Sequence, residues 1–256
     1  MSFWVKRGNM GAIQNIISRR TGAGSTSAYI GFLADNTFTF YDPSNGCQLI
    51  TNRTVEDTSK FYHFLIRYEA SNATQADRIQ IYADGERQTF TTSVAISDAN
   101  GNFNAAVVHA IGKFQYSNIY YFDGYLAEVN WIDGTNYGPE TFGVTDTSTG
   151  RWIPKTLSGI TYGTNGFRLE FGDSSALGDD TSGNTNDFTA TNLASTDQNT
   201  DSPTQNHNNM GGSKNGGTSV AEGNLETTTP GSGSGYMQII GQPGFGISSG
   251  KVYWEV

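Results

Sequence analysis

Residues 120–134, YYFDGYLAEVNWIDG, constrain the fold of this chain more than any other stretch. Every second residue from Tyr125 to Trp131 is apolar, which is the two-residue period of a β-strand with one buried face. Gly124 interrupts the stretch, where a β-bulge or a close backbone contact is typical, and Asp133-Gly134 supplies turn chemistry at its end. The stretch therefore predicts a central strand of a β-sandwich. One face would carry Tyr125, Ala127, Val129 and Trp131, and the other Leu126, Glu128 and Asn130.

Short strand-like segments recur along the chain at spacings of about 8 to 15 residues, as in β-sandwiches. They cover residues 3–6, 12–19, 29–40, 48–52, 60–69, 78–90, 109–114, 151–155 and 166–171. Two of them are expected to be hairpins, with Asn36 left-handed in the first turn and Asp84-Gly85 forming the second. No stretch keeps a 3.6-residue apolar period, and Pro139–Phe142 is at most one helical turn. The sequence predicts an all-β fold, an antiparallel two-sheet sandwich.

Residues 60–69 alternate most cleanly. The predicted buried face of this strand consists of Tyr62, Phe64, Ile66 and Tyr68.

Composition narrows the function. The chain has 24 acidic and 15 basic residues and a net charge of −9, which argues against nucleic-acid partners and anionic membrane surfaces. No apolar run is long enough to span a bilayer, and none follows Lys6 and Arg7, so we expect neither membrane insertion nor a signal peptide. Cys47 is the only cysteine, which excludes a disulfide framework and a Cys-rich zinc site.

Three phrases carry a resemblance to a known family. FDGYLAEVNWIDG, preceded by SFWVKRG and followed by GPETFG, resembles the laminin-G-like (concanavalin A-like) jelly rolls of bacteriophage tail-fibre proteins. The block FYHFLIRYEA…DRIQIYADGERQTF and the phrase around DTSGNTN resemble the same modules. The resemblance covers roughly residues 2–193 and implies a concanavalin A-like sandwich there. It also implies that an N-terminal segment is missing, which would leave an open sheet edge.

The rest of the chain has a different composition. Residues 194–235 are dominated by Asn, Ser, Thr, Gly and Gln, and such a segment cannot bury enough apolar surface to offset its ordering entropy. We expect it to be a linker or a partly ordered loop. Residues 236–256 end in SSGKVYWEV, which resembles the first strands of a SPRY domain, so both ends of the chain are predicted to be truncated.

Catalytic signatures are weak. Endo-glucanases of the concanavalin A-like fold need two carboxylates on one strand face, but Glu128 and Asp133 have a spacing that predicts opposite faces. His63, His109 and His207 stand in unrelated contexts, and His63 and His109 are each expected to be a polar-face or hydrogen-bonded core histidine. We therefore expect no enzymatic activity.

Calcium is the cofactor that the resemblance suggests, because laminin-G-like domains often bind one ion. Asp123, Asp173 and Asp180 are the acids in family-like phrases. The alternative is that these aspartates only form Asx turns.

A cluster of aromatic and amide side chains flanks the predicted central strand. It consists of Tyr116, Asn118, Tyr120, Tyr121, Asn136 and Tyr137. Such residues suit sugar recognition, in which rings stack and amides bond hydroxyls. The alternative is that the tyrosines are half-buried with their hydroxyls at the rim.

The favoured function is a non-enzymatic binding module of a phage tail fibre or virion adhesin. It would recognise a host-surface glycan or protein receptor, assemble with other virion subunits as a homotrimer, and be made in the host cytoplasm. The alternatives are a structural spacer or decoration domain and, more remotely, a glycan hydrolase.

Overall fold

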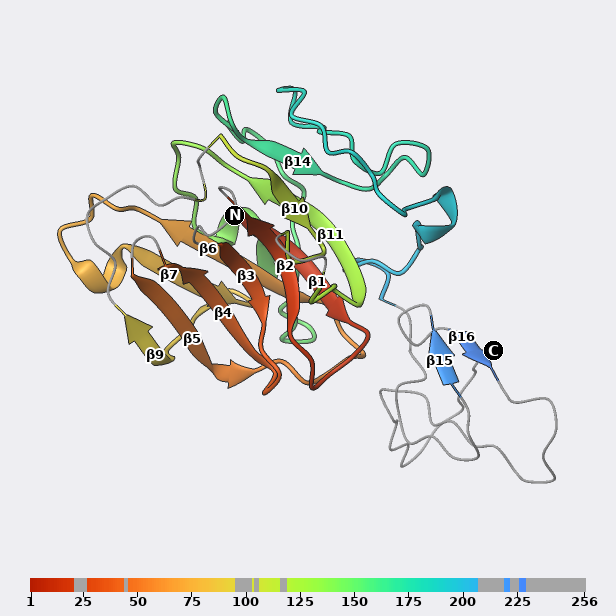
Figure 1. Ribbon diagram of the computed structural model, residues 1–256, viewed down its shortest axis with the longest axis horizontal. Helices are drawn as coiled ribbons and strands as arrows, with labels where there is room; N and C mark the ends of the chain where they lie inside the picture. The colour runs from red at the N-terminus through yellow and green to blue at the C-terminus, as the bar shows by residue number, and fades with distance from the viewer. Residues whose placement is uncertain are drawn as a thin grey trace.

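Two six-stranded antiparallel sheets pack face to face in the computed structural model (Figure 1). The structure describes residues 1–20, 27–43, 46–94, 103, 106–115, 119–206, 219–221 and 226–228. The predicted all-β sandwich is confirmed.

The first sheet, sheet A, carries the site described below. In spatial order its strands are β14 (Phe167–Leu169), β11 (Gly124–Trp131), β1 (Ser2–Arg7), β6 (Tyr62–Tyr68), β7 (Ile79–Ala83) and β8 (Glu86–Arg87). Sheet B consists of β10 (His109–Ile111), β2 (Gln14–Arg19), β3 (Ala28–Phe32), β4 (Thr37–Asp42), β5 (Cys47–Thr54) and β9 (Phe90–Val94). Two hairpins lie outside these sheets, β12 (Gly143–Thr145) with β13 (Trp152–Pro154) and β15 (Ser219–Ala221) with β16 (Glu226–Thr228). Single 3₁₀ turns form at Gln75–Asp77, Pro139–Thr141 and Ser195–Asp197.

Phenylalanine rings join the two sheets at the centre of the core. Phe64 of sheet A stacks on Phe38 of sheet B, with ring centroids 4.1 Å apart, and Phe3 and Phe32 pack around them. Tyr62, Phe64 and Ile66 belong to the buried core and Tyr68 packs against it, so the predicted face of β6 is confirmed. β6 pairs with β1 and β7 without a register shift, so the alternation in its sequence carries through to a single face.

A β-bulge changes the faces of β11. Ser2 pairs with Asn130 but Trp4 pairs with Ala127, so Phe3 of β1 faces two residues of β11, one of which is Glu128 at φ 51°. The extra residue reverses the alternation: Leu126 faces the core before the bulge, and Val129 and Trp131 face it afterwards. The prediction that Tyr125 and Ala127 share the buried face was therefore wrong.

Local backbone predictions agree with the structure. Gly124 has φ 146°, and a Cβ there would collide with the carbonyl oxygen of Lys6, which confirms a close backbone contact. Asp84 and Gly85 have φ 51° and 82°, as a tight hairpin turn requires, and Asn36 is left-handed at φ 65°.

Longer-range predictions needed correction. Phe90, expected to belong to the returning strand of the 78–90 hairpin, begins β9 in the other sheet. The strand predicted at 151–155 forms β13, which pairs with β12 in a hairpin outside the sandwich sheets. Each change depends on a pairing partner distant in sequence.

The remaining domain predictions concern the two ends of the chain. β1 pairs on both sides, with β11 and β6. Residues 194–206, expected to belong to the linker, contain Asp201 and Asn206, which contact the sandwich. Residues 236–256 lie outside the described part of the chain. Among the described residues no helix is long and apolar enough to cross a membrane.

Candidate functional site

The predicted sugar-binding cluster is divided between two places. Tyr120 and Tyr121 precede β11, whereas Asn136 and Tyr137 follow it. Since β11 has 8 residues and a strand rises about 3.3 Å per residue, the two pairs lie roughly 25 Å apart. Tyr116 and Asn118 are outside the described residues. One sugar site cannot include both pairs, so each place must be judged separately.

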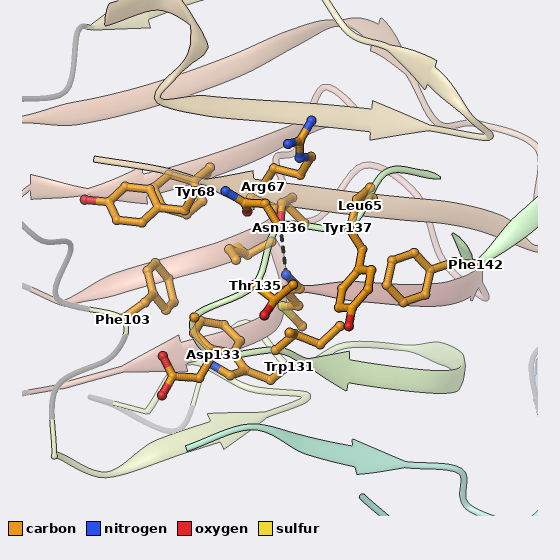
Figure 2. Close-up of a pocket in the computed structure, with 16 residues that line it drawn as sticks. Leu65, Arg67, Tyr68, Phe103, Trp131, Asp133, Thr135, Asn136, Tyr137 and Phe142 are labelled. Atoms are coloured by element: carbon orange, nitrogen blue, oxygen red, sulfur yellow. Dashed lines mark hydrogen bonds between the residues drawn. The ribbon is translucent and has the colours of Figure 1, made fainter. Parts of the chain in front are cut away.

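The first place is the strand-end pocket, where β1 begins and β11 ends (Figure 2). Asn136 and Tyr137 line it together with Trp131, Tyr68 and Phe103, and its volume is about 170 Å³. Most of the other lining residues are apolar.

Two polar side chains of the strand-end pocket, Tyr137 and Asp133, are already bonded. The Tyr137 hydroxyl accepts a hydrogen bond from the Thr161 amide at 3.0 Å. Asp133 accepts one from Asn165 at 2.7 Å. The Nε of Arg67 has no hydrogen-bond partner among the described residues, but it is covered and so not offered to a ligand.

The second place is the side groove, with a volume of about 520 Å³. It runs between residues 111–113, residues 121–127 and segments within residues 170–202, next to the outer face of β11. In Figure 1 the chain that follows β14 lies on this side of the sandwich. The groove is large enough for an oligosaccharide of a few residues.

Aromatic and polar groups converge in the side groove. Tyr121 is 58 % exposed and lines the groove together with Tyr125, whose ring the bulge at Glu128 leaves on the outer face. The polar lining consists of Lys113, Glu170, Asn192, Asp197, Gln198, Asn199, Asp201 and Ser202. Rings for stacking beside carboxylates and amides for hydroxyls are the groups that a sugar requires.

Strained backbone also gathers at the side groove. Phe171 and Asn192, which line it, have φ 57° and 58°, and Tyr120, next to Tyr121, has φ 55°. Bulky residues rarely adopt this conformation, and such outliers cluster at functional sites. The strand-end pocket has no positive-φ residue besides a glycine among its described lining residues.

Comparison with protein families identifies the fold. The model of the concanavalin A-like lectin/glucanase superfamily, of laminin-G type, matches residues 1–136, more than half of the chain. This chain belongs to the concanavalin A-like lectin/glucanase superfamily. Comparisons with curated proteins and with solved structures gave no match. The phage origin and the SPRY-like segment stay predictions.

The three aspartates predicted to bind calcium, Asp123, Asp173 and Asp180, are not brought together as ligands. Asp180 accepts hydrogen bonds from the amides of Arg168, Ser182 and Asn186 and from the Ser182 hydroxyl. Asp173 accepts two from Ser175. At Asp180 burial alone would raise the pKa, but these bonds together lower it, and at Asp173 the bonds from Ser175 lower the pKa; both carboxylates are engaged as in Asx turns. In the described ranges no three His, Cys, Asp or Glu residues gather as metal ligands, so Asp123, Asp173 and Asp180 do not fit a shared calcium site.

A glucanase of this superfamily would need a catalytic carboxylate pair. Glu128 and Glu170 both bond Nη2 of Arg168, at 2.9 and 2.7 Å. In a glycosidase the two carboxylates flank the scissile bond, whereas here both are bonded to the same guanidinium. Asp133, the other acid in the sequence phrase, lies at the strand-end pocket. The arrangement is that of a surface ion-pair network.

His63 is a structural residue of the superfamily sandwich. Trp152 donates its indole N–H to Nδ1 of His63 at 3.2 Å, so Nε2 carries the proton and donates to the Ser2 hydroxyl at 2.9 Å. Burial lowers the pKa of His63 to about 3, which keeps the ring neutral. Because the histidine is the donor, it cannot activate Ser2 as a base would.

Sequence reasoning found Tyr121 but missed most of the side groove. Tyr125 was assigned to the buried face, and Asp197, Gln198 and Asp201 were assigned to a linker. The orientation of Tyr125 follows from the bulge, which the positive φ of Glu128 reveals in the structure. No local sequence signal marks Glu128 as the bulge residue.

Proposed function

We propose that this chain is a non-enzymatic carbohydrate-binding module whose ligand lies in the side groove. The observation that carries the proposal is the convergence of Tyr121 and Tyr125 with carboxylate and amide side chains in one groove of about 520 Å³. Membership of a lectin and glucanase superfamily supports a sugar ligand. The ion-paired state of Glu128 and Glu170 supports binding without hydrolysis.

The net charge of the chain favours neutral glycans. Within the groove Glu170 pairs with Arg168 and Asp201 with Lys6, which leaves Asp197 and Lys113 as the charged lining residues outside these two ion pairs. The whole chain carries a net charge of −9. Glycans with sulfate or uronate groups would be repelled, so neutral hexose oligomers are the expected class.

The biological setting that we propose is a virion adhesin of the tail-fibre type. A single groove of this kind binds weakly, but three copies on a fibre would bind a host surface far more tightly through effective concentration. We therefore expect a homotrimer in a virion, with a host-surface glycan as its receptor, because three linked copies would gain avidity.

Calorimetric titration with neutral and uronate-containing oligosaccharides tests the proposal. Tyr121→Ala should weaken binding of a neutral oligomer by roughly tenfold, since an aromatic contact contributes about 0.5–1.5 kcal/mol. Tyr121→Phe keeps the ring and should bind nearly as wild type. Tyr137→Ala, at the strand-end pocket, is the matched control and should leave affinity unchanged.

The outcomes also separate the alternatives. If neither the monomer nor a forced trimer binds any oligosaccharide, the chain is a spacer or decoration domain. If Tyr137→Ala rather than Tyr121→Ala abolishes binding, the strand-end pocket is the site. Release of new reducing ends from a polysaccharide by the wild-type protein would contradict the non-enzymatic part of the proposal.

A further inference from the structure

We infer that Lys6 and Asp201 are positioning residues for the side groove, because their buried ion pair holds residues 191–202 where these form one wall of it. Residues 191–202 are named the strap. The inference deepens the proposed function, and it rests on that function only for the identity of the ligand.

The strap has one buried anchor. Residues 189–200 are all exposed, and Asp201 is the only buried residue between 189 and 206. The strap nevertheless supplies eight of the groove's lining residues, including Asn192, Gln198 and Asn199. A wall with so little packing of its own must be held by specific contacts.

Those contacts converge on Lys6, at the centre of sheet A. Its Nζ lies 2.6 Å from Oδ2 of Asp201, and neither side chain has any exposed surface. The same Nζ donates to Oδ1 of Asn206 at 2.9 Å, and Asn206 donates to the Ser59 carbonyl at 2.8 Å. Gln198 of the strap also donates to the Phe171 carbonyl at 2.7 Å, in a contact on the surface.

The buried ion pair between Lys6 and Asp201 determines where the strap lies. Such a pair adds little net stability, because desolvation offsets the attraction between its charges. Loss of one partner is costly, because it leaves a charge buried without compensation. The lone charge then regains water most easily if the strap lifts, since the strap has no other buried side chain. Lifting it separates Asn192 and Gln198 from Tyr121 across the groove.

Hydrogen exchange and calorimetry on the same variants test the inference. In Asp201→Leu, amide exchange of residues 191–202 should accelerate on the order of tenfold or more, while exchange in β6 and β7 stays as in wild type. Affinity for the neutral oligosaccharide that the wild-type protein binds should fall about tenfold, the loss expected when one or two wall hydrogen bonds disappear. Asp201→Asn keeps an acceptor for Lys6 and should show a smaller change in both measurements.

A second buried ion pair provides the matched control. Arg19 and Asp42 lie within sheet B, 3.4 Å apart and with almost no exposed surface, and neither of them lines the side groove. Asp42→Asn should lower the melting temperature without selective exchange in the strap.

Two results would overturn the inference. One is a strap in Asp201→Leu that exchanges as slowly as in wild type. The other is exchange that rises in the strap and in sheet A together, which would make the pair a general stabiliser. If the wild-type protein binds no oligosaccharide but Asp201→Leu still frees the strap, the proposed function fails and the inference on positioning stands.

Discussion

Both faces of sheet A are buried along β1 and most of β6, but different interactions bury them. The inner face presents Phe3, Phe64 and Val129 to sheet B, and its stability comes from apolar area and ring packing. The outer face buries polar groups, among them Lys6 and His63, each matched by a partner from a distant segment. An apolar face is stabilised by any closely packed apolar neighbour. A buried polar group instead needs a hydrogen-bond or ion-pair partner at a defined position. The side groove, which is the proposed binding site, lies beside this outer face, where specific partners position loops.

The largest effect is expected at the centre of the inner face. Phe64→Ala should lower the free energy of unfolding by about 3–5 kcal/mol, because it leaves a cavity beside Phe38 and Phe3. Urea denaturation measures the change. Phe64→Leu fills more of the space and should cost less, so equal losses in both variants would contradict a packing origin.

The outer face should respond to acid where the inner face does not. The folded pKa of His63 is lowered to about 3, so below its ordinary pKa of 6.5 the unfolded chain binds a proton that the folded chain excludes. Stability should thus fall as pH drops from about 6.5 towards 3, by up to about 1.4 kcal/mol per pH unit.

The test is urea denaturation of wild type and His63→Gln between pH 7.5 and 4. The variant should be less stable than wild type at pH 7.5. Its free energy of unfolding should fall less steeply with pH, because it lacks the contribution from protonation of His63 in the unfolded chain. Parallel curves for the two proteins would show that His63 does not titrate in this way.

A smaller loss is expected where β1 and β11 come closest. Gly124→Ala should cost about 1–3 kcal/mol, because φ 146° disfavours a side chain and the Cβ would meet the Lys6 carbonyl. Gly134→Ala is the matched control: it also has positive φ, 82°, but nothing lies within 4 Å of its added Cβ. Thermal melts that show a greater loss for Gly134→Ala would argue against the close contact.

The smallest effect is expected at the solvent-exposed ion pair between Arg87 and Asp77. Asp77→Asn should change the free energy of unfolding by less than about 1 kcal/mol, because both side chains are substantially exposed and water screens the pair. The same measurement in high salt should show almost no difference from wild type. A large loss of stability in Asp77→Asn would mean that this exposed ion pair contributes to stability as much as buried charges do.

Part of the fold could be predicted because its signals are local. The alternation in β6 places Tyr62, Phe64 and Ile66 in the core, and Asp84-Gly85 forms its turn from its own backbone preferences. The candidate site was predictable only at Tyr121. Tyr125 was misplaced because one bulge residue reverses a strand's faces, and alternation alone does not show where a bulge falls.

By itself the sequence determined an all-β sandwich, its main strands and the identity of its inner core, since these follow from the two-residue period of apolar side chains. The tertiary structure alone decided which outer-face groups are buried and what they bind. Lys6 meets Asp201 across 195 positions of sequence. No local pattern encodes such a pairing, because a charged residue stays buried only where the folded chain brings its partner to it.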